Sequence, residues 1–251
     1  MKKELLFAFI AFFLMSLTAI TGVYAIEGDS RKLTLKNSSE DITGDGIRED
    51  ISIQGIPYQK SEKVYKKILL TVKFSNGKTY EKVFEYGLNP KFKLIDFNHD
   101  GVKDVFLTVP RSENGDIKDY YLYTVNNFVL TELPLPESME IEGQFTNGYK
   151  AKITIPATNK TIVFDLMFKK DQYEALGMYQ NGKLNEPTEL VILPYGNVTP
   201  FLTSDNKYGL SESQKISGAS YSDTIGFVDS KWYFKEGKWM LYETDIRENR
   251  K

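Results

Sequence analysis

Oxygen-bearing side chains recur at short, regular intervals between residues 96 and 104, a stretch that reads DFNHDGVKD. Carboxylate and amide oxygens at alternate positions of a tight loop can point inward together, and a hard cation such as Ca²⁺ binds about six to eight oxygens. Gly101 permits the sharp turn that such a loop needs. The pattern therefore predicts a calcium site. Its side-chain ligands would be Asp96, Asn98, Asp100 and Asp104, and Val102 would supply its backbone carbonyl.

A second stretch, DITGDGIRE at residues 41–49, repeats the pattern. Its predicted ligands are the side chains of Asp41, Thr43, Asp45 and Glu49 and the backbone carbonyl of Ile47. Asp50 replaces Glu49 if the register shifts by one residue. A threonine hydroxyl is a weaker ligand than a carboxylate or an amide, so we expect tighter binding in the loop at 96–104.

The alternative for both loops is a surface turn without an ion, because Asp, Asn and Gly favour turns by themselves. Three carboxylates held close together repel one another unless a cation lies between them, and this favours calcium. Neither loop is an EF-hand, since the twelfth position, a bidentate Glu in EF-hands, holds Ser52 or Leu107. Extracellular modules bind calcium weakly, at about 10⁻⁴ to 10⁻³ M, so we expect one or two structural Ca²⁺ ions.

The elements that must position these loops are short strands. Runs rich in β-branched and aromatic residues alternate with turn signals after the first 25 residues. Asn-Gly pairs at 76–77, 147–148 and 181–182 and a Glu-Gly pair at 236–237 are typical of hairpin turns, because glycine tolerates positive φ. Residues 167–180 are compatible with a helical turn. The sequence predicts an all-β fold, which can be a sandwich, a barrel or a propeller.

The two acidic loops begin 55 residues apart, at Asp41 and Asp96. Equal steps lead to position 151, in a strand-like run without an acidic loop, and to position 206, where Lys207 replaces an oxygen ligand. Units of roughly 50 residues are long enough for the four strands of a propeller blade. We therefore expect a propeller-like array of about four short antiparallel blades. The alternative is an irregular β-sandwich that contains a local duplication.

The loop pattern followed by a strand resembles the calcium loops of FG-GAP and VCBS-type repeats, which read DxDxDGxxD and lie between two strands of a blade. With its N-terminal segment and the closing pair KWYFKEGKWMLYE, the chain is similar to small exported VCBS repeat-containing proteins of Gram-positive bacteria. The resemblance implies a calcium-stabilised β-repeat protein of the cell surface. Thr43 and the missing ligands near position 206 depart from the pattern.

The first 25 residues are predicted to be a signal peptide. Two lysines precede the apolar run LLFAFIAFFLMSLTAI, and Val23-Tyr24-Ala25 is typical of a cleavage site. The alternative is an uncleaved membrane anchor, since Leu5–Ala25 is about long enough to span a bilayer. The absence of cysteine from an exported chain favours a bacterial origin. Residues 26–251 are predicted to form a single domain.

The sequence marks out no catalytic residues. His99 is the only histidine, we expect it to face solvent, and cysteine is absent, so a Ser-His-Asp or Cys-His site is excluded. The net charge of −2 without a basic stripe argues against nucleic acid as a partner. We expect no membrane partner if the signal segment is cleaved.

The aromatic clusters of the chain are expected to be mainly core, although on an exposed face they would form a platform for carbohydrate or protein. They are Tyr120, Tyr121, Tyr123, Trp232, Tyr233 and Trp239. Because Tyr120 and Tyr121 point to opposite faces of a strand, at most part of this set should be core.

Together these features predict a secreted, non-catalytic interaction module of the bacterial surface or envelope, with a surface protein or a glycan as its partner. One alternative is an extracellular glycan hydrolase that uses two carboxylates. Another is a structural component of a coat or wall.

Overall fold

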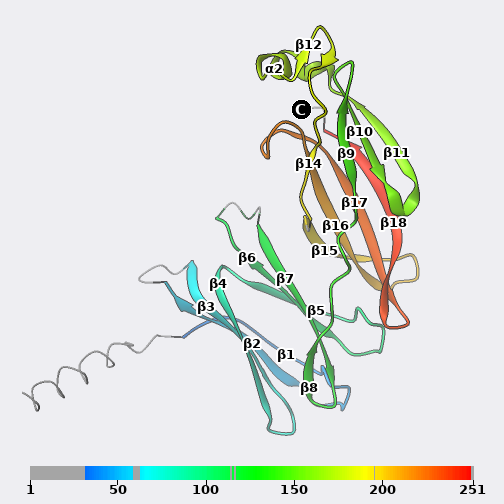
Figure 1. The fold of residues 1–251 in the computed structure, drawn as a ribbon. Coiled ribbons are helices and arrows are strands. Elements are labelled where there is room, and N and C mark those ends of the chain that lie inside the picture. The colour runs from blue at the N-terminus through cyan, green and yellow to red at the C-terminus, as the bar shows by residue number, and fades with distance from the viewer. Residues whose placement is uncertain (1–31, 59–62, 114, 116, 195, 250–251) are drawn as a thin grey trace, which may run out of the picture.

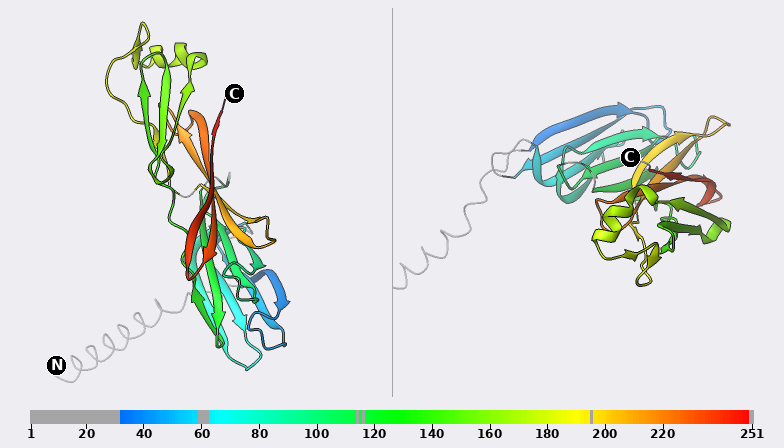
Figure 2. Two further views of the ribbon diagram at one scale, coloured as in Figure 1. Left: turned by 90° about the vertical axis from the view of Figure 1, so that its right-hand side faces the viewer. Right: turned by 90° about the horizontal axis from the view of Figure 1, so that it is seen from above.

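The computed structural model of the protein describes residues 32–58, 63–113, 115, 117–194 and 196–249. The predicted signal peptide, residues 1–25, lies outside the described residues. The described chain is built mainly of antiparallel strands with one short α-helix, so the predicted all-β class is confirmed. The molecule is elongated, with residues 33–132 in one lobe and residues 142–248 in the other (Figures 1 and 2). Within the described part of the chain, no helix has the length and hydropathy needed to cross a membrane.

The N-terminal lobe consists of two four-stranded antiparallel sheets in which each strand pairs with the next along the chain. The first sheet contains β1 (Leu33–Glu40), β2 (Glu49–Pro57), β3 (Val64–Lys73) and β4 (Thr79–Leu88). The second contains β5 (Lys91–Ile95), β6 (Asp104–Pro110), β7 (Lys118–Asn126) and β8 (Val129–Glu132).

A shared hydrophobic core lies between these two sheets, because side chains alternate between the two faces of a strand. Ile51 and Ile53 of β2 are fully buried in it, as are Val105 and Leu107 of β6. Each acidic loop therefore enters a strand that is anchored in the core of the N-terminal lobe.

The C-terminal lobe has a different architecture. A three-stranded sheet contains β9 (Glu142–Thr146), β10 (Lys150–Ile155) and β11 (Lys160–Asp165). The short turns η1 (Pro156–Thr158) and η2 (Met167–Lys169), the helix α2 (Lys170–Ala175) and the hairpin of β12 (Tyr179–Gln180) with β13 (Lys183–Leu184) follow. The last sheet contains β14 (Val191–Ile192), β15 (Asn197–Leu202), β16 (Tyr208–Ser217), β17 (Thr224–Lys235) and β18 (Lys238–Glu248). Helix α2 and β12 lie at the end farthest from the N-terminal lobe (Figures 1 and 2).

Strand β6 is buried on both of its faces, because the second sheet lies between the first sheet and the C-terminal lobe. Phe106 points away from the core described above and joins Phe97, Val198 and Leu210 in a separate cluster that spans the two lobes. The backbone N–H of Val198 also donates to the hydroxyl of Tyr120 at 3.1 Å. The prediction of one domain over residues 26–251 stays a prediction.

The double burial corrects the expectation for the tyrosines of β7. Tyr120 faces the cluster between the lobes, whereas Tyr121 and Tyr123 face the core of the N-terminal lobe. The two faces are opposite, as predicted, but both are covered by a sheet, so all three residues belong to hydrophobic clusters.

The array of four blades is not present. Two similar four-stranded sheets do follow the spacing of 55 residues, but position 151 lies in the three-stranded sheet. Position 206 lies in the tight turn between β15 and β16, where the N–H of Lys207 donates to Thr203 Oγ1 at 3.1 Å. The described residues form no closed propeller. Strands β16 to β18 contain 10, 12 and 11 residues, and such long hairpins give the same alternation of strand and turn as blades do.

Predictions made from short sequence patterns were more accurate than the prediction of four blades. The four glycine-containing turn pairs each connect paired strands, and Gly77, Gly148, Gly182 and Gly237 all have positive φ. The helical turn expected within residues 167–180 corresponds to η2 and α2.

Candidate metal centre in two equivalent loops

The two acidic loops occupy equivalent places in their sheets. One connects β1 to β2 and the other connects β5 to β6, so each joins the first two strands of a four-stranded sheet. The last predicted ligand of each loop, Glu49 or Asp104, is the first residue of the strand that follows. Sheet pairing therefore fixes both ends of each loop.

The first aspartate of each loop accepts hydrogen bonds from the same two backbone positions. Asp41 Oδ1 accepts from the N–H of Gly44 at 2.7 Å, and its Oδ2 accepts from Gly46 at 2.9 Å. Asp96 Oδ1 accepts from His99 at 2.6 Å, and its Oδ2 accepts from Gly101 at 3.0 Å. Residues at these four donor positions all have positive φ, so the backbone bends in the same way around the first aspartate of each loop.

The second aspartate and the closing acid of each loop repeat the match. Asp45 Oδ1 accepts from the N–H of Ile47 at 2.7 Å, and Asp100 Oδ1 accepts from Val102 at 2.9 Å. Glu49 Oε2 accepts from Ile42 at 3.0 Å, and Asp104 Oδ2 accepts from Phe97 at 2.8 Å. The position-by-position equivalence predicted from the sequence thus extends to the hydrogen-bond network.

In the first loop, Glu49 and not Asp50 lies in the position that is equivalent to Asp104. The side chain of Glu49 is fully buried, whereas Asp50 faces solvent on the opposite side of β2. Thr43 Oγ1 lies 3.5 Å from Asp41 Oδ1 and 3.4 Å from Glu49 Oε1, so it connects the first and last acids of the loop.

The loops differ in what surrounds their remaining oxygens. Ser75 Oγ donates to Asp45 Oδ2 at 2.7 Å in the first loop. In the second loop Asn98 Nδ2 donates to Asp100 Oδ2 at 2.9 Å and to Thr124 Oγ1 at 3.1 Å. Neutral hydrogen-bond donors therefore occupy carboxylate oxygens that a bound cation would need as ligands.

The electrostatic consequences also differ. Burial acts to raise the pKa of Asp41, but the N–H donors of Gly44, Gly46 and Thr43 outweigh it, and the pKa is lowered. Burial dominates at Asp104 and raises its pKa to about 6, despite hydrogen bonds from Phe97, Thr124 and Asn98. The carboxyl of Asp104 is 1% exposed, so its charge is costly unless a cation accompanies it.

The oxygen donors of both loops suit a hard cation by type, but in this conformation they do not converge fully. Among the residues that the structure describes, no three His, Cys, Asp or Glu side chains gather closely enough to hold one ion. Hydrogen bonds from backbone N–H groups stabilise the first aspartate of each loop instead.

His99 is partly buried, and it makes contacts with the C-terminal lobe that the expectation of a solvent-facing residue did not include. Its Nε2 lies 2.8 Å from the carbonyl oxygen of Tyr208, and its ring stacks on Tyr233 with centroids 4.8 Å apart. Both partners belong to the C-terminal lobe, a contact between distant segments that no local pattern could predict.

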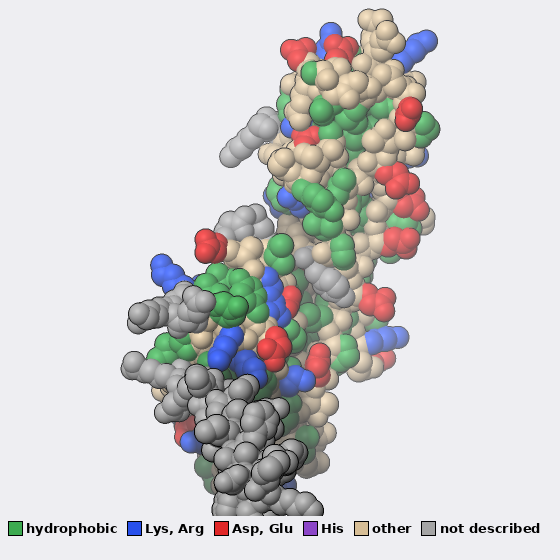
Figure 3. Space-filling view, turned by 60° about the vertical axis from the view of Figure 1, so that its left-hand side comes forward, with side chains coloured by type: hydrophobic (Ala, Val, Ile, Leu, Met, Phe, Trp, Pro, Cys, Tyr) green, Lys and Arg blue, Asp and Glu red, His purple; other side chains and the backbone are tan. Residues whose placement is uncertain are grey.

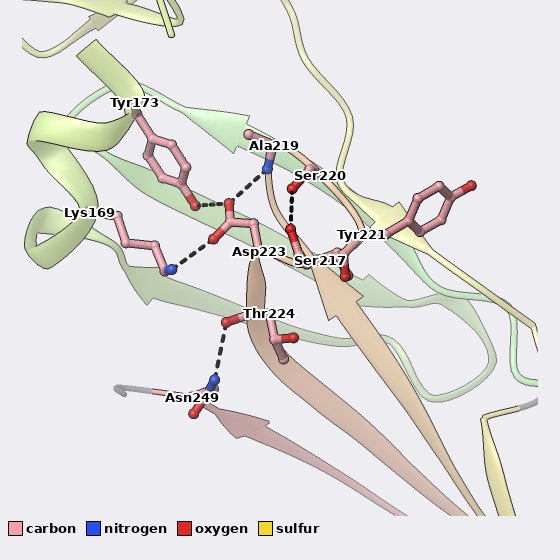
Figure 4. A network of polar contacts seen from close by, with 10 residues as sticks. Lys169, Tyr173, Ser217, Ala219, Ser220, Tyr221, Asp223, Thr224 and Asn249 are labelled. Carbon is pink, nitrogen blue, oxygen red and sulfur yellow. Dashed lines mark hydrogen bonds and ion pairs between the residues drawn. The ribbon is translucent and has the colours of Figure 1, made fainter. Parts of the chain in front are cut away.

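A buried ionic cluster in the C-terminal lobe had no signal in the sequence (Figure 4). Asp223 Oδ1 accepts from Lys169 Nζ at 2.7 Å, and its Oδ2 accepts from Tyr173 Oη at 2.8 Å and from the N–H of Ala219 at 2.9 Å. Burial acts to raise the pKa of Asp223, but these donors outweigh it and lower the pKa. The cluster ties η2 and α2 to the turn between β16 and β17, and all its oxygens are engaged within the protein.

The surface of the molecule shows no basic stripe on the face in Figure 3, where acidic and basic side chains are interspersed over both lobes. This distribution agrees with the net charge of −2.

Comparison with known proteins contradicts the predicted resemblance to FG-GAP and VCBS repeats. Residues 139–247 match the family model described as the YybI C-terminal domain. The chain is also 24% identical over 215 residues to the uncharacterized protein YybI of Bacillus subtilis (strain 168). The aligned residues cover 81% of each of the two chains. No solved structure matches the chain. The bacterial relative agrees with the predicted bacterial origin.

No FG-GAP or VCBS family matches, so the resemblance inferred from the loops was wrong as a statement of family. The reason is physical. A loop of nine residues is shaped by Asp, Asn and Gly turn chemistry, and this chemistry is available to any antiparallel hairpin.

Proposed function

We propose that this chain is an exported, non-catalytic β-sheet scaffold of the bacterial envelope, in which the two acidic loops take up Ca²⁺ as structural ions. The observation that carries the proposal is the shared hydrogen-bond network, which holds equivalent acids of both loops in equivalent positions. Export rests on the predicted signal peptide.

The ion would be held in the second loop by Asp96, Asn98, Asp100 and Asp104 with the carbonyl of Val102, and in the first by Asp41, Thr43, Asp45 and Glu49 with the carbonyl of Ile47. It would supply charge compensation. This matters most at Asp104, whose buried carboxylate is expensive without a cation. The protein's own contribution is to fix the loop ends by strand pairing and to hold the first aspartate with two N–H donors.

A thermal melt of the secreted protein, with about 1 mM Ca²⁺ or with a chelator, tests the proposal. At a dissociation constant of about 10⁻⁴ M, each ion contributes about 1.4 kcal/mol, which raises the melting temperature by about 3–6 °C. Asp100→Ala and Asp45→Ala should each remove part of this gain. Asp50→Ala, which changes an exposed acid beside the first loop, should not. A melting temperature that does not respond to Ca²⁺ would contradict the proposal.

A second candidate function, glycan hydrolysis, has one observation in its favour. Glu142 and Glu189 line a single cavity of about 550 Å³ beside β9, together with Lys152 and Thr154. Two carboxylates in one groove meet the minimal requirement of a glycosidase. Release of reducing sugar from cell-wall glycans, abolished by Glu142→Gln or Glu189→Gln, would establish it, and absence of turnover would leave the non-catalytic scaffold.

A further inference from the structure

The sheet formed by β15 to β18 has one covered face and one open face. Val198, Leu210, Ile216 and Val228 are buried on the covered face, where they pack against the N-terminal lobe at one end and against the rest of the C-terminal lobe at the other. Residues one position away along each strand point outward. The strand pairing places Phe201 opposite Gly209 and Tyr233 opposite Met240 on this outward face, and at this end of the sheet His99 of the N-terminal lobe stacks on Tyr233.

Aromatic side chains meet on the open face. The rings of Phe201 on β15 and Tyr242 on β18 lie 5.8 Å apart, although β16 and β17 run between their strands. Gly209 makes this approach possible, because a Cβ at that position would lie 2.6 Å from the ring of Phe201. Tyr242 is 49% exposed and neighbouring Met240 is 45% exposed, so their side chains remain accessible to a partner.

Polar side chains frame these rings, and their charges are paired with one another. Lys231 Nζ lies 2.6 Å from Glu243 Oε2 and 5.7 Å from the centroid of Phe201. Further along the sheet, Arg247 Nη2 donates to Asp229 Oδ1 at 3.0 Å. Both pairs still have donors and acceptors left for a ligand, since a carboxylate has about four lone-pair sites and an ammonium has three donors.

This combination restricts the chemistry of a partner. Paired charges give no net attraction for a polyanion, and charged groups among the rings disfavour an apolar protein surface or a lipid tail. A polysaccharide with β-linked pyranose rings fits, because each ring presents C–H groups on its faces and hydroxyls at its edge. The C–H faces can stack on Tyr242 and Phe201, and the hydroxyls can exchange hydrogen bonds with Lys231 and Glu243.

We infer that the outward face of β15–β18 binds an uncharged, β-linked polysaccharide such as the glycan strand of the cell wall. The inference rests on the proposed function as a non-catalytic envelope scaffold and names the partner class of that scaffold.

Binding is measured with the protein secreted by a host that expresses the full chain. The probes are peptidoglycan sacculi freed of teichoic acid, for cosedimentation, and chitohexaose, for calorimetry. We expect saturable binding that persists in about 1 M NaCl, because the sugar rings that make the contacts carry no charge for salt to screen. Tyr242→Ala should weaken binding about ten-fold, and Phe201→Ala should do the same. Tyr58→Ala removes a tyrosine of similar exposure from the N-terminal lobe and should leave binding unchanged.

The inference is overturned if neither probe binds, if high salt abolishes binding, or if Tyr242→Ala binds as well as the unchanged protein. Tyr242 is half exposed, so the melting temperature of its variant should stay close to that of the parent and show that the fold is intact. The calcium melt is independent of this assay. A calcium-stabilised protein that fails to bind either probe refutes only the glycan inference, and glycan binding without a calcium effect refutes only the calcium proposal.

Discussion

Loop 41–49 and loop 96–104 differ in the hydrophobic core that each one reaches. The residue after the first aspartate is fully buried in both loops, but Ile42 packs into the core of the N-terminal lobe, whereas Phe97 packs into the cluster between the lobes. The fourth position differs as well. Gly44 in the first loop is exposed, and His99 in the second contacts Tyr208 and Tyr233 of the C-terminal lobe.

The same hydrogen-bond network within a loop is therefore found in two different structural settings. Hydrogen bonds within each loop depend on the spacing of its acids and glycines, and these are alike. The burial of Phe97 and the contacts of His99 depend on the neighbouring sheet, and only the second sheet has the C-terminal lobe beside it. The first loop closes a hairpin, whereas the second also joins the lobes.

The largest effects should come from the two buried residues. Phe97→Ala should lower the free energy of unfolding by about 3–5 kcal/mol and Ile42→Ala by about 2–5 kcal/mol. Only Phe97→Ala removes a contact between the lobes, so small-angle scattering should show an increased radius of gyration for this variant alone. Equal radii for both variants would mean that the second loop does not hold the lobes together.

The carboxylate of Asp223 pairs with an ammonium, whereas the first aspartate of each acidic loop accepts hydrogen bonds from backbone N–H groups. Asp223→Asn leaves the Lys169 ammonium, whose side chain is only 14% exposed, without its carboxylate partner and should lower the free energy of unfolding by about 3–5 kcal/mol in urea titrations. The lowered pKa of Asp223 means that its stabilisation is present above the ordinary value of 3.8 and is lost as pH falls through the folded pKa. Asp171→Asn, an exposed change on α2, is the control and should have little effect. A variant of Asp223 as stable as the control would show that the ion pair is dispensable.

The buried carboxyl of the second loop should oppose folding when no cation is bound. The pKa of Asp104 is about 6 in the folded state against an ordinary value of 3.8. Between these values the folded state retains a proton that the unfolded state has released, so stability should fall as pH rises, by about 3 kcal/mol in total. In chelator, Asp104→Asn should abolish this dependence and be the more stable protein at pH 7, as measured by urea unfolding. With Ca²⁺, the parent should regain stability and the variant should not. Unfolding of the parent in chelator with no pH dependence in this range would contradict the prediction.

The smallest effect should come from His99. Its φ of 63° is tolerated by asparagine, so His99→Asn removes the ring without straining the backbone. Loss of the contacts with Tyr208 and Tyr233 should cost about 1 kcal/mol and make the connection between the lobes, residues 133–141, more sensitive to protease. Arg48→Ala, at an exposed position of the first loop, should change neither measurement. If the two variants behave alike, the contacts of His99 do not stabilise the molecule.

Features with a short sequence span were predictable. The acids and glycines of both loops, the turn pairs and the all-β class all follow from residues within about ten positions of one another. The choice between Glu49 and Asp50 was left open, because only pairing of β2 with β3 decides which side chain turns inward. The number of blades and the family were wrong, since turn spacing alone does not distinguish a blade from a long hairpin.

By itself, the sequence determined that strands would dominate and that two loops would hold their acids in the same way, because hydrogen bonds within a loop and alternation along a strand are local. Only the tertiary structure decided that β6 and β7 are buried on both faces, that Lys169 pairs with Asp223, and that Phe201 meets Tyr242 on an open face. These contacts join residues far apart in the chain. Their geometry depends on which sheets pack together, and packing is governed by the combined shape and hydrophobic surface of whole elements.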